Sequence, residues 1–222
     1  MIPKPAQAKA SASYKWTALF ITTLGAFMAP LDGSIVAVAI PSIASSIGMS
    51  LEIVVWIPLA YLLLLTAFLI SAGRVADLKG RKRTYVFGFI TFTSGSVLCG
   101  LSSTGLQLIA FRALQGIGAS FITANSAAIV TDSFPSAERG KALGINATAV
   151  YLGLMTGPVI GGFLVQNFGW PSIFFVNVPI GVVVVTLALL RLKEIHVNPQ
   201  GEGFDLAGLQ HSRFRSPPSW QV

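Results

Sequence analysis

The chain has 222 residues, of which 53% are apolar and only 10% are charged. A soluble domain carries about 25% charged residues, so this composition excludes a protein that folds in water, and the mean hydropathy of +0.73 agrees. The single cysteine excludes an intrachain disulfide framework and a cysteine-based metal cluster. The composition therefore predicts an integral membrane protein.

Six apolar stretches are long enough to cross a hydrocarbon core about 30 Å thick, which needs about 20 helical residues. Irregular backbone cannot face lipid with its polar groups unsatisfied, so we expect all six to be helices. The predicted fold class is an all-α integral membrane bundle, with a cytoplasmic arm at 1–15, the bundle at 16–192 and a polar cytoplasmic tail at 193–222. The spans are expected at 17–40, 53–72, 84–101, 106–130, 142–165 and 172–190.

The basic residues orient this bundle. Of the 15 lysines and arginines, all except Arg112 lie in the N-terminal arm, the second-to-third connection, the fourth-to-fifth connection and the tail. Positive residues concentrate on the cytoplasmic side of membrane proteins. We therefore expect a multi-pass protein of the plasma membrane with its N-terminus in the cytoplasm. The net charge of +7 is then a topology signal and does not indicate nucleic-acid binding.

Two charged residues lie inside predicted spans. Asp32 is in the first span and Arg112 is in the fourth. A charge at the membrane centre costs about 2.5–3.5 kcal/mol on insertion scales, so it is rarely found without a partner or a water-filled cavity. At 1.5 Å per residue, both fall at similar depth in the outer half. They are either a buried ion pair that ties two helices together or a titratable site that faces an aqueous cavity.

Two segments share one sequence frame. Gly73 to Gly80 follows the second span and Gly162 to Gly169 follows the fifth, each with glycines seven residues apart and a polar residue four positions after the first glycine. The first copy is basic and the second has no charge. This pattern suggests two three-helix repeats inserted with inverted topology, a construction found in secondary transporters.

The fifth span carries Gly153, Gly157 and Gly161, spaced four residues apart so that they form one smooth helix face for close packing. Pro158 removes a backbone hydrogen bond and favours a bend. We expect this glycine face to contact another helix of the bundle, with or without an additional role in gating.

These motifs together resemble the major facilitator superfamily, and within it the fourteen-span drug:proton antiporter branch, over about residues 14–208. The segment 73–83 resembles the signature cytoplasmic loop of that family, 112–118 its fourth-helix motif, 153–162 the antiporter motif, and 31–36 with 40–41 the first-helix motif of the branch. The segments 169–170 and 174–181 are also similar to the branch. The resemblance implies the N-terminal bundle of a major facilitator fold.

The resemblance also implies a function, namely proton-driven efflux of small apolar or cationic compounds by alternating access. It needs no cofactor or metal, since the proton gradient supplies the energy, and no enzymatic activity. The implied partners are the lipid bilayer, protons and the substrates. The resemblance implies proton and substrate coupling for Asp32, Arg112 and Gln115. It implies that the loop motif locks the cytoplasmic side in one conformation, through Gly73, Asp77, Gly80 and Arg81. It implies that the fifth-helix motif favours exchange over symport, through Gly153, Gly157, Pro158, Gly161 and Gly162.

The family pattern requires a second bundle to enclose the transport site, and we expect this chain to be a truncated N-terminal half. Residues 204–208 look like the approach to a seventh span, after which the sequence turns polar and out of family. Two alternatives remain open. A second half-bundle or self-association could complete the site, or the chain could be a membrane scaffold that transports nothing itself.

Overall fold

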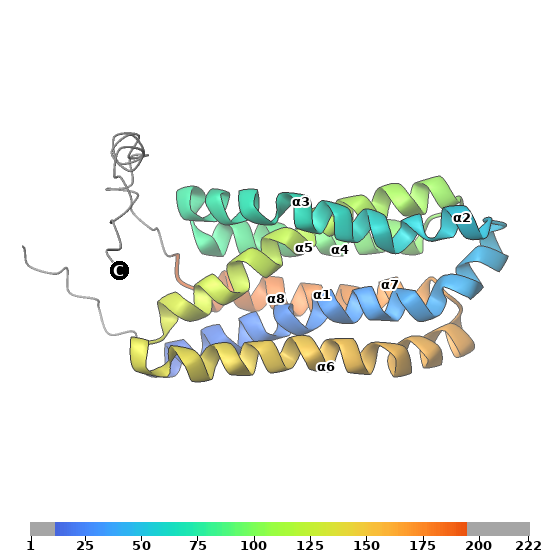
Figure 1. Ribbon diagram of the computed structural model, residues 1–222. Coiled ribbons are helices and arrows are strands. Elements are labelled where there is room, and N and C mark those ends of the chain that lie inside the picture. Colours follow the sequence, from blue (N-terminus) through green and yellow to red (C-terminus); the bar gives the residue numbers. More distant parts are fainter. Residues whose placement is uncertain (1–11, 195–222) are drawn as a thin grey trace, which may run out of the picture.

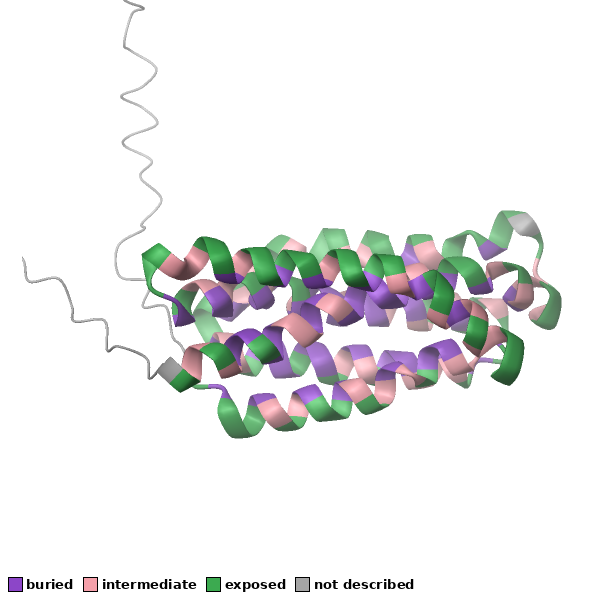
Figure 2. Ribbon diagram, turned by 90° about the horizontal axis from the view of Figure 1, so that it is seen from below, coloured by how far each residue is buried: buried purple, intermediate pink, exposed green. Residues whose placement is uncertain are grey.

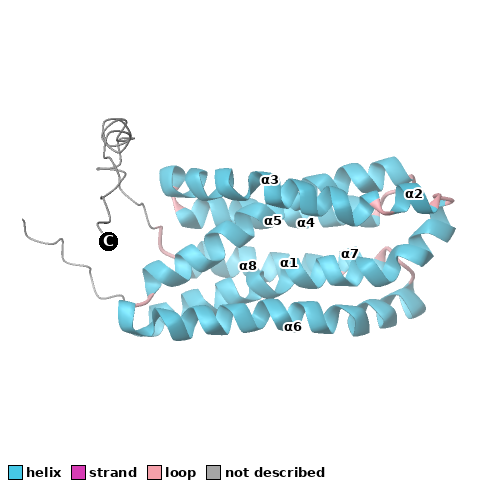
Figure 3. Cartoon of the chain, in the orientation of Figure 1, coloured by secondary structure: helices cyan, strands magenta, loops and turns pink. Residues whose placement is uncertain are grey.

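The computed structural model describes residues 12–194. This part of the chain consists of helices joined by short loops and has no strand (Figure 3). Residues 1–11 and 195–222, and with them most of the predicted arm and tail, lie outside the described residues. The helices are α1 (Ala12–Ile47), α2 (Leu51–Val54), α3 (Trp56–Lys79), α4 (Arg81–Gly100), α5 (Gly105–Ser133), α6 (Ser136–Phe168), α7 (Ser172–Phe175) and α8 (Asn177–Arg191).

Each of the six predicted spans corresponds to one long helical segment, so the predicted fold class is confirmed. Within residues 12–194, five segments are long and apolar enough to cross a membrane: α1, α2 with α3, α5, α6, and α7 with α8. The remaining predicted span, at 84–101, corresponds to α4, which has 20 residues. It opens with Arg81, Lys82 and Arg83 and is rich in glycine, serine and threonine. Its inward-facing small and polar residues make it less apolar than its neighbours.

The helices are longer than the predicted spans. The first was expected at 17–40, but α1 has 36 residues and continues through Pro30 and Pro41. The fifth was expected at 142–165, but α6 has 33 residues. A hydropathy pattern measures the hydrocarbon core, whereas a helix ends where its backbone is capped. In α1 this happens at Gly48, which has a positive φ of 70°.

The segment predicted as a cytoplasmic loop is mostly helical, and this is a correction. Gly73 and Asp77 belong to the last turns of α3, and Arg81 begins α4. Only Gly80 lies between the two helices, with φ 100° and ψ 138°, a conformation that L side chains rarely adopt. Its N–H still donates to the carbonyl of Ala76, so the corner is completed by one glycine.

The corner after α6 is built in the same way. Gly169 has φ 79° and ψ 167°, and its N–H donates to the carbonyl of Val165. Gly80 and Gly169 are the last glycines of the two segments that share a sequence frame, and they lie at opposite ends of the bundle, because α3 and α6 run in opposite directions (Figure 1). The structure thus agrees with the predicted inverted three-helix repeats.

The long helices form two groups joined by α5. Helices α3 and α4 pack on α5, whereas α1 packs along α6, and α8 contacts both α4 and α1 (Figure 1). The start of α1 and the end of α8 lie at the same end of the bundle, where the N–H of Lys193 donates to the hydroxyl of Tyr14 over 3.2 Å. We call this the basic end, because the α3–α4 corner with Arg81, Lys82 and Arg83 is also there.

Buried residues face the centre of the bundle and apolar residues also cover its outside (Figure 2). Two apolar clusters fill the interior. One, toward the basic end, contains Tyr85, Phe89 and Phe92. The other, toward the opposite end, contains Ile35 and Phe174. The exterior of α3 and α6 exposes large apolar side chains, which a bilayer would cover: Leu62, Leu63, Ile70, Met155, Val159 and Phe163.

Candidate functional site

The two charged residues predicted at similar depth contact each other. Nη1 of Arg112 on α5 lies 2.5 Å from Oδ2 of Asp32 on α1, and neither residue has any exposed surface. Neither side chain therefore reaches the outer surface of the bundle. They do not line an open cavity in this structure, because both are completely enclosed between the two apolar clusters. The buried ion pair, one of the two arrangements considered from the sequence, is what the structure contains.

Gln115 completes a triangle with this pair. It lies three residues after Arg112 on the same face of α5, as neighbouring turns of a helix require. Its Oε1 accepts from Nη1 of Arg112 over 2.7 Å, and its Nε2 donates to Oδ1 of Asp32 over 2.9 Å. All three residues predicted for proton and substrate coupling are therefore brought together at one buried point.

Two further residues of this cluster were not predicted. Nδ2 of Asn177 lies 2.7 Å from Oδ1 of Asp32 and 2.9 Å from Oγ of Ser96, and Ser96 also accepts from Nε2 of Gln115 over 3.1 Å. Both are completely buried. The one sequence signal for Asn177 was its carboxamide among the apolar residues of the sixth predicted span. We call these five residues the polar cluster: Asp32, Ser96, Arg112, Gln115 and Asn177.

The rest of the arginine is held by aromatic and backbone groups. Its guanidinium carbon lies 4.2 Å from the ring centroid of Tyr61 and 5.9 Å from that of Phe174, distances at which cations are attracted to ring faces. Its Nε donates to the carbonyl of Ile57 over 3.4 Å. Among the described residues, Nη2 of Arg112 and Oδ1 of Asn177 have no hydrogen-bond partner.

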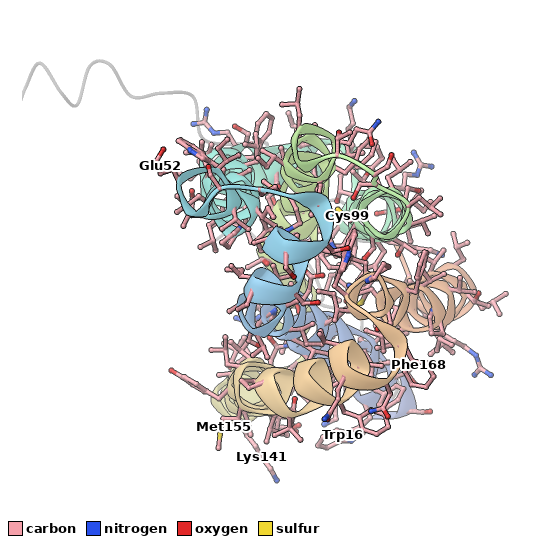
Figure 4. The ribbon with its side chains drawn as sticks, turned by 90° about the vertical axis from the view of Figure 1, so that its right-hand side faces the viewer. Trp16, Glu52, Cys99, Lys141, Met155 and Phe168 are labelled. Carbon is pink, nitrogen blue, oxygen red and sulfur yellow. The ribbon has the colours of Figure 1, made fainter. Side chains whose placement is uncertain are left out.

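Figure 4 shows the same interior along the helices. Cys99 lies between them, whereas Glu52 and Met155 lie at the periphery. The Cys99 thiol is 3.8 Å from Oε1 of Gln115, so it borders the polar cluster. In the described part of the chain no group of three histidine, cysteine or acidic residues could hold a metal ion.

The cluster has a defined chemistry. Asp32 supplies the one negative charge, Arg112 the one positive charge, and the amides and hydroxyl supply neutral dipoles. A proton or a substrate cation that reached Asp32 would compete with Arg112 for the carboxylate. Because Asp32 is on α1 and Arg112 on α5, any such competition would alter a contact between two helices.

A second charged group lies at the basic end. Arg81 lies 3.2 Å from Oδ1 of Asp77 on α3 and 3.0 Å from Oδ2 of Asp132 near the end of α5. The predicted pair, Asp77 and Arg81, is thus in contact, and Asp132 is a partner that the motif did not indicate. Gly80 brings Arg81 to this position, whereas a side chain at Gly73 would meet no atom within 4 Å.

The segment after α8 also reaches this corner. Oε1 of Glu194 accepts from the backbone N–H of Lys82 over 3.1 Å, and Oε2 lies 3.6 Å from Nε of Arg83. A side chain at Gly80 would collide with Glu194. The α3–α4 corner of the first repeat is therefore tied to the end of the second repeat at the basic end.

The glycine face of the fifth span lies against α1, as predicted. A Cβ at Gly153 would meet the carbonyl of Phe27, one at Gly157 would meet the hydroxyl of Ser34, and one at Gly161 would lie 3.2 Å from the carbonyl of Ile35. Gly162 differs, because its Cβ would meet no atom within 4 Å. Helix α6 continues through Pro158 without interruption.

Comparison with known proteins gives consistent results. The sequence profile of the Major Facilitator Superfamily matches residues 22–220. The riboflavin transporter RibZ of Clostridioides difficile is 42% identical over 195 residues, which are 88% of this chain and 43% of that protein. The multidrug resistance protein Stp of Mycobacterium tuberculosis is 41% identical over 191 residues, 86% of this chain and 35% of that protein.

A solved structure shows the same fold. The proton:xylose symporter XylE superposes with a TM-score of 0.74 at 15% identity, over 82% of this chain and 46% of that one. The chain thus spans less than half the length of these proteins. A family profile that matches most of the chain, sequence identities above 40% and a shared fold lead to one conclusion: the chain belongs to the major facilitator superfamily of membrane transporters.

Proposed function

We propose that the bundle is the N-terminal half of a proton-coupled exporter of small apolar or cationic compounds, located in the plasma membrane. The observation that supports this most is the polar cluster, in which a buried carboxylate on α1 is paired with a buried arginine on α5. Buried charges are costly in a membrane and are commonly found in proton and ion pathways.

The proposed coupling uses competition for Asp32. In the arrangement seen here, the carboxylate accepts from Arg112, Gln115 and Asn177. A proton on Asp32 would remove the negative charge that holds Arg112. The α1–α5 contact would then weaken, and an opening of the interior to one side would expose Asp32 to water. Alternating access would join proton uptake to that movement.

The proposed role of the basic end is to stabilise one conformation. Arg81 joins the α3–α4 corner to α5 through Asp77 and Asp132, and Glu194 joins the same corner to the segment after α8. Movement of these helices relative to one another would have to break these pairs. They are exposed or half-buried, so the energy involved is of the order of 1 kcal/mol per pair.

A chimera tests this proposal. Residues 16–192 would replace the corresponding segment of the Mycobacterium tuberculosis multidrug resistance protein, and dye uptake into proton-loaded vesicles would be followed, because an exchanger moves dye inward as protons leave. We expect uptake that depends on the pH gradient, its loss in Asp32→Asn, and its retention in Glu52→Gln, which removes an exposed carboxylate. Normal uptake by the Asp32→Asn chimera, with equal amounts of protein in the membrane, would contradict the proposal.

The 222-residue chain alone is proposed to be inactive, because alternating access rocks one bundle against another around a site between them. The same vesicle assay with the purified chain checks this. Gradient-driven dye uptake by vesicles that hold the chain alone would favour a working assembly of two copies. No activity in either the chain or the chimera would favour the non-transporting subunit considered from the sequence.

Riboflavin is a second candidate substrate, because RibZ is 42% identical over 88% of this chain. The chimera vesicles, supplied with labelled riboflavin in place of dye, distinguish the two. Movement of riboflavin without movement of apolar cations would replace the proposed substrate class but keep the transport function.

A further inference from the structure

A cavity of about 670 Å³ opens at the basic end of the bundle, away from the polar cluster. Its size falls in the range of ligand pockets, about 300–1,000 Å³. Three helices line it: α3 with Val75, Leu78 and Lys79, α4 with Arg83, Thr84 and Phe87, and α5 with Phe121. We propose that this cavity binds one anionic phospholipid of the leaflet at the basic end.

The lining is divided by depth as a phospholipid is. Lys79 and Arg83 lie on either side of the α3–α4 corner, at the mouth of the cavity. Phe87 lies four residues farther along α4 than Arg83, about 6 Å deeper in the membrane at 1.5 Å per residue. Its ring packs edge-on against Phe121, with centroids 5.2 Å apart. Cations thus lie at the level of a headgroup and apolar walls at the level of acyl chains.

The charges at the mouth favour an anion. Lys79 forms no ion pair with any residue in the described range 12–194, and its side chain is exposed. Arg83 contacts Glu194 at 3.6 Å, but 75% of its side-chain surface is exposed, so its guanidinium remains available. The nearby acids are Asp77 and Asp132, which share Arg81, and Glu194, which also accepts from the backbone N–H of Lys82. A phosphodiester between Lys79 and Arg83 would complete this arrangement.

The occupant is a membrane lipid and not a soluble phosphate, because Val75, Leu78, Phe87 and Phe121 continue the cavity into the apolar part of the bundle. A free phosphate would leave these walls uncovered. Basic pockets between membrane helices on the cytoplasmic side are known places for acidic headgroups. The site lies on α3, α4 and α5, so this inference does not depend on the transport mechanism.

Native mass spectrometry of the full 222-residue chain, titrated with phosphatidylglycerol or with phosphatidylcholine of the same chains, tests the site. We expect the first phosphatidylglycerol to bind more tightly than phosphatidylcholine. Each basic residue near a membrane surface contributes about five-fold to binding of an acidic headgroup. Lys79→Gln with Arg83→Gln should therefore weaken phosphatidylglycerol binding by at least about five-fold and phosphatidylcholine binding by less, because the choline cation offsets the charge of its phosphodiester.

The matched control is Lys141→Gln with Arg191→Gln, which removes two exposed cations from the same end of the bundle but outside this cavity. It should bind phosphatidylglycerol like the original chain. Equal losses in the two double variants would mean that general surface charge attracts the lipid, and would overturn the proposal. So would equal binding of the two lipids by the original chain.

Val75→Phe fills the apolar part and keeps both cations, so it tests the site even if the double variant does not fold. We expect weaker phosphatidylglycerol binding, and unchanged binding would contradict a lipid held in the cavity. Excess glycerol 3-phosphate should not displace the bound lipid. Displacement of the lipid would mean that the cavity binds a soluble phosphate, and would overturn the proposal. A dimer of the chain that dissociates in the variant with Lys79→Gln and Arg83→Gln would mean that a second copy occupies the cavity, and would also overturn it.

Discussion

The amide nitrogen of Asn177 lies 2.7 Å from Oδ1 of Asp32, and this bond joins the first and last of the described helices, α1 and α8, across 145 residues of sequence. The same nitrogen lies 2.9 Å from Oγ of Ser96 on α4. One carboxamide therefore connects α8 to both α1 and α4, at the depth where Arg112 also reaches Asp32. Helix α8 thus contributes a side chain to the polar cluster.

We predict that Asn177→Val lowers the free energy of unfolding by about 1–3 kcal/mol, because a buried carboxylate and a hydroxyl each lose a donor. Asp32 keeps Arg112 and Gln115, so the fold should persist. Thermal unfolding in detergent measures the loss. Asn167→Val is the control, because Asn167 is exposed and donates only to Phe163 on its own helix. Equal stabilities of the two variants would contradict the prediction.

A double-mutant cycle on Asp32 and Arg112 should give a large coupling. Arg112→Met leaves a buried carboxylate unpaired, which we expect to cost about 3–5 kcal/mol. Adding Asp32→Asn removes that charge and should restore part of the stability. The half-exposed pair of Lys15 and Glu138 is the comparison, where a coupling of about 0–1 kcal/mol is expected. Additive losses at Asp32 and Arg112 would show that the ion pair contributes nothing to the fold.

The glycine face of α6 provides a matched pair of variants. Gly157→Leu places a side chain where the hydroxyl of Ser34 lies, and we expect a loss of about 1–3 kcal/mol or more from overpacking. Gly162→Leu is five residues away on the same helix, at a position where an added Cβ would meet no atom within 4 Å. It should unfold at the same temperature as the original chain in detergent. A loss at Gly162 as large as that at Gly157 would mean that the contact with α1 is not the cause.

The orientation of the bundle is testable with two fusions. Alkaline phosphatase joined after Arg191 should be inactive, and green fluorescent protein joined there should fluoresce, because the basic end is predicted to be cytoplasmic. The same reporters joined after Gly169, at the opposite end of the bundle, should give the reverse result. An active phosphatase after Arg191 would overturn the predicted orientation.

The fold could be predicted from hydropathy because the membrane leaves few alternatives. Runs of about 20 apolar residues must be helices, and the cations of the α3–α4 corner assign one end. The helix ends were missed for a physical reason. A helix such as α1 continues into the headgroup region until Gly48 caps it, and hydropathy has no signal there. The same limit made residues 73–80 look like a loop, although Gly73 and Asp77 are helical.

In the polar cluster, the charged residues could be found because charge inside a span is rare. Their depths placed Asp32 and Arg112 at one level, and an ion pair was one of the two arrangements considered. Asn177 and Ser96 could not, because neutral polar residues are frequent in membrane helices and only their angular position selects a partner. Asp132 was missed for another reason. It lies just beyond the predicted fourth span, where a charged residue is ordinary, and only the fold brings it to Arg81.

The corners at Gly80 and Gly169 have the same backbone design, but only the first is followed by three cations. The orientation of a membrane segment depends on the positive charges beside it, whereas the packing of its helices depends on the shapes of their surfaces. A three-helix unit can therefore be inserted in either direction without a new fold, provided that the arginines and lysines at its corner are gained or lost. In this chain the second unit has Trp170, Pro171 and Ser172 after its corner glycine, and uncharged residues at that corner are what the positive-inside rule expects on the side opposite to the cations.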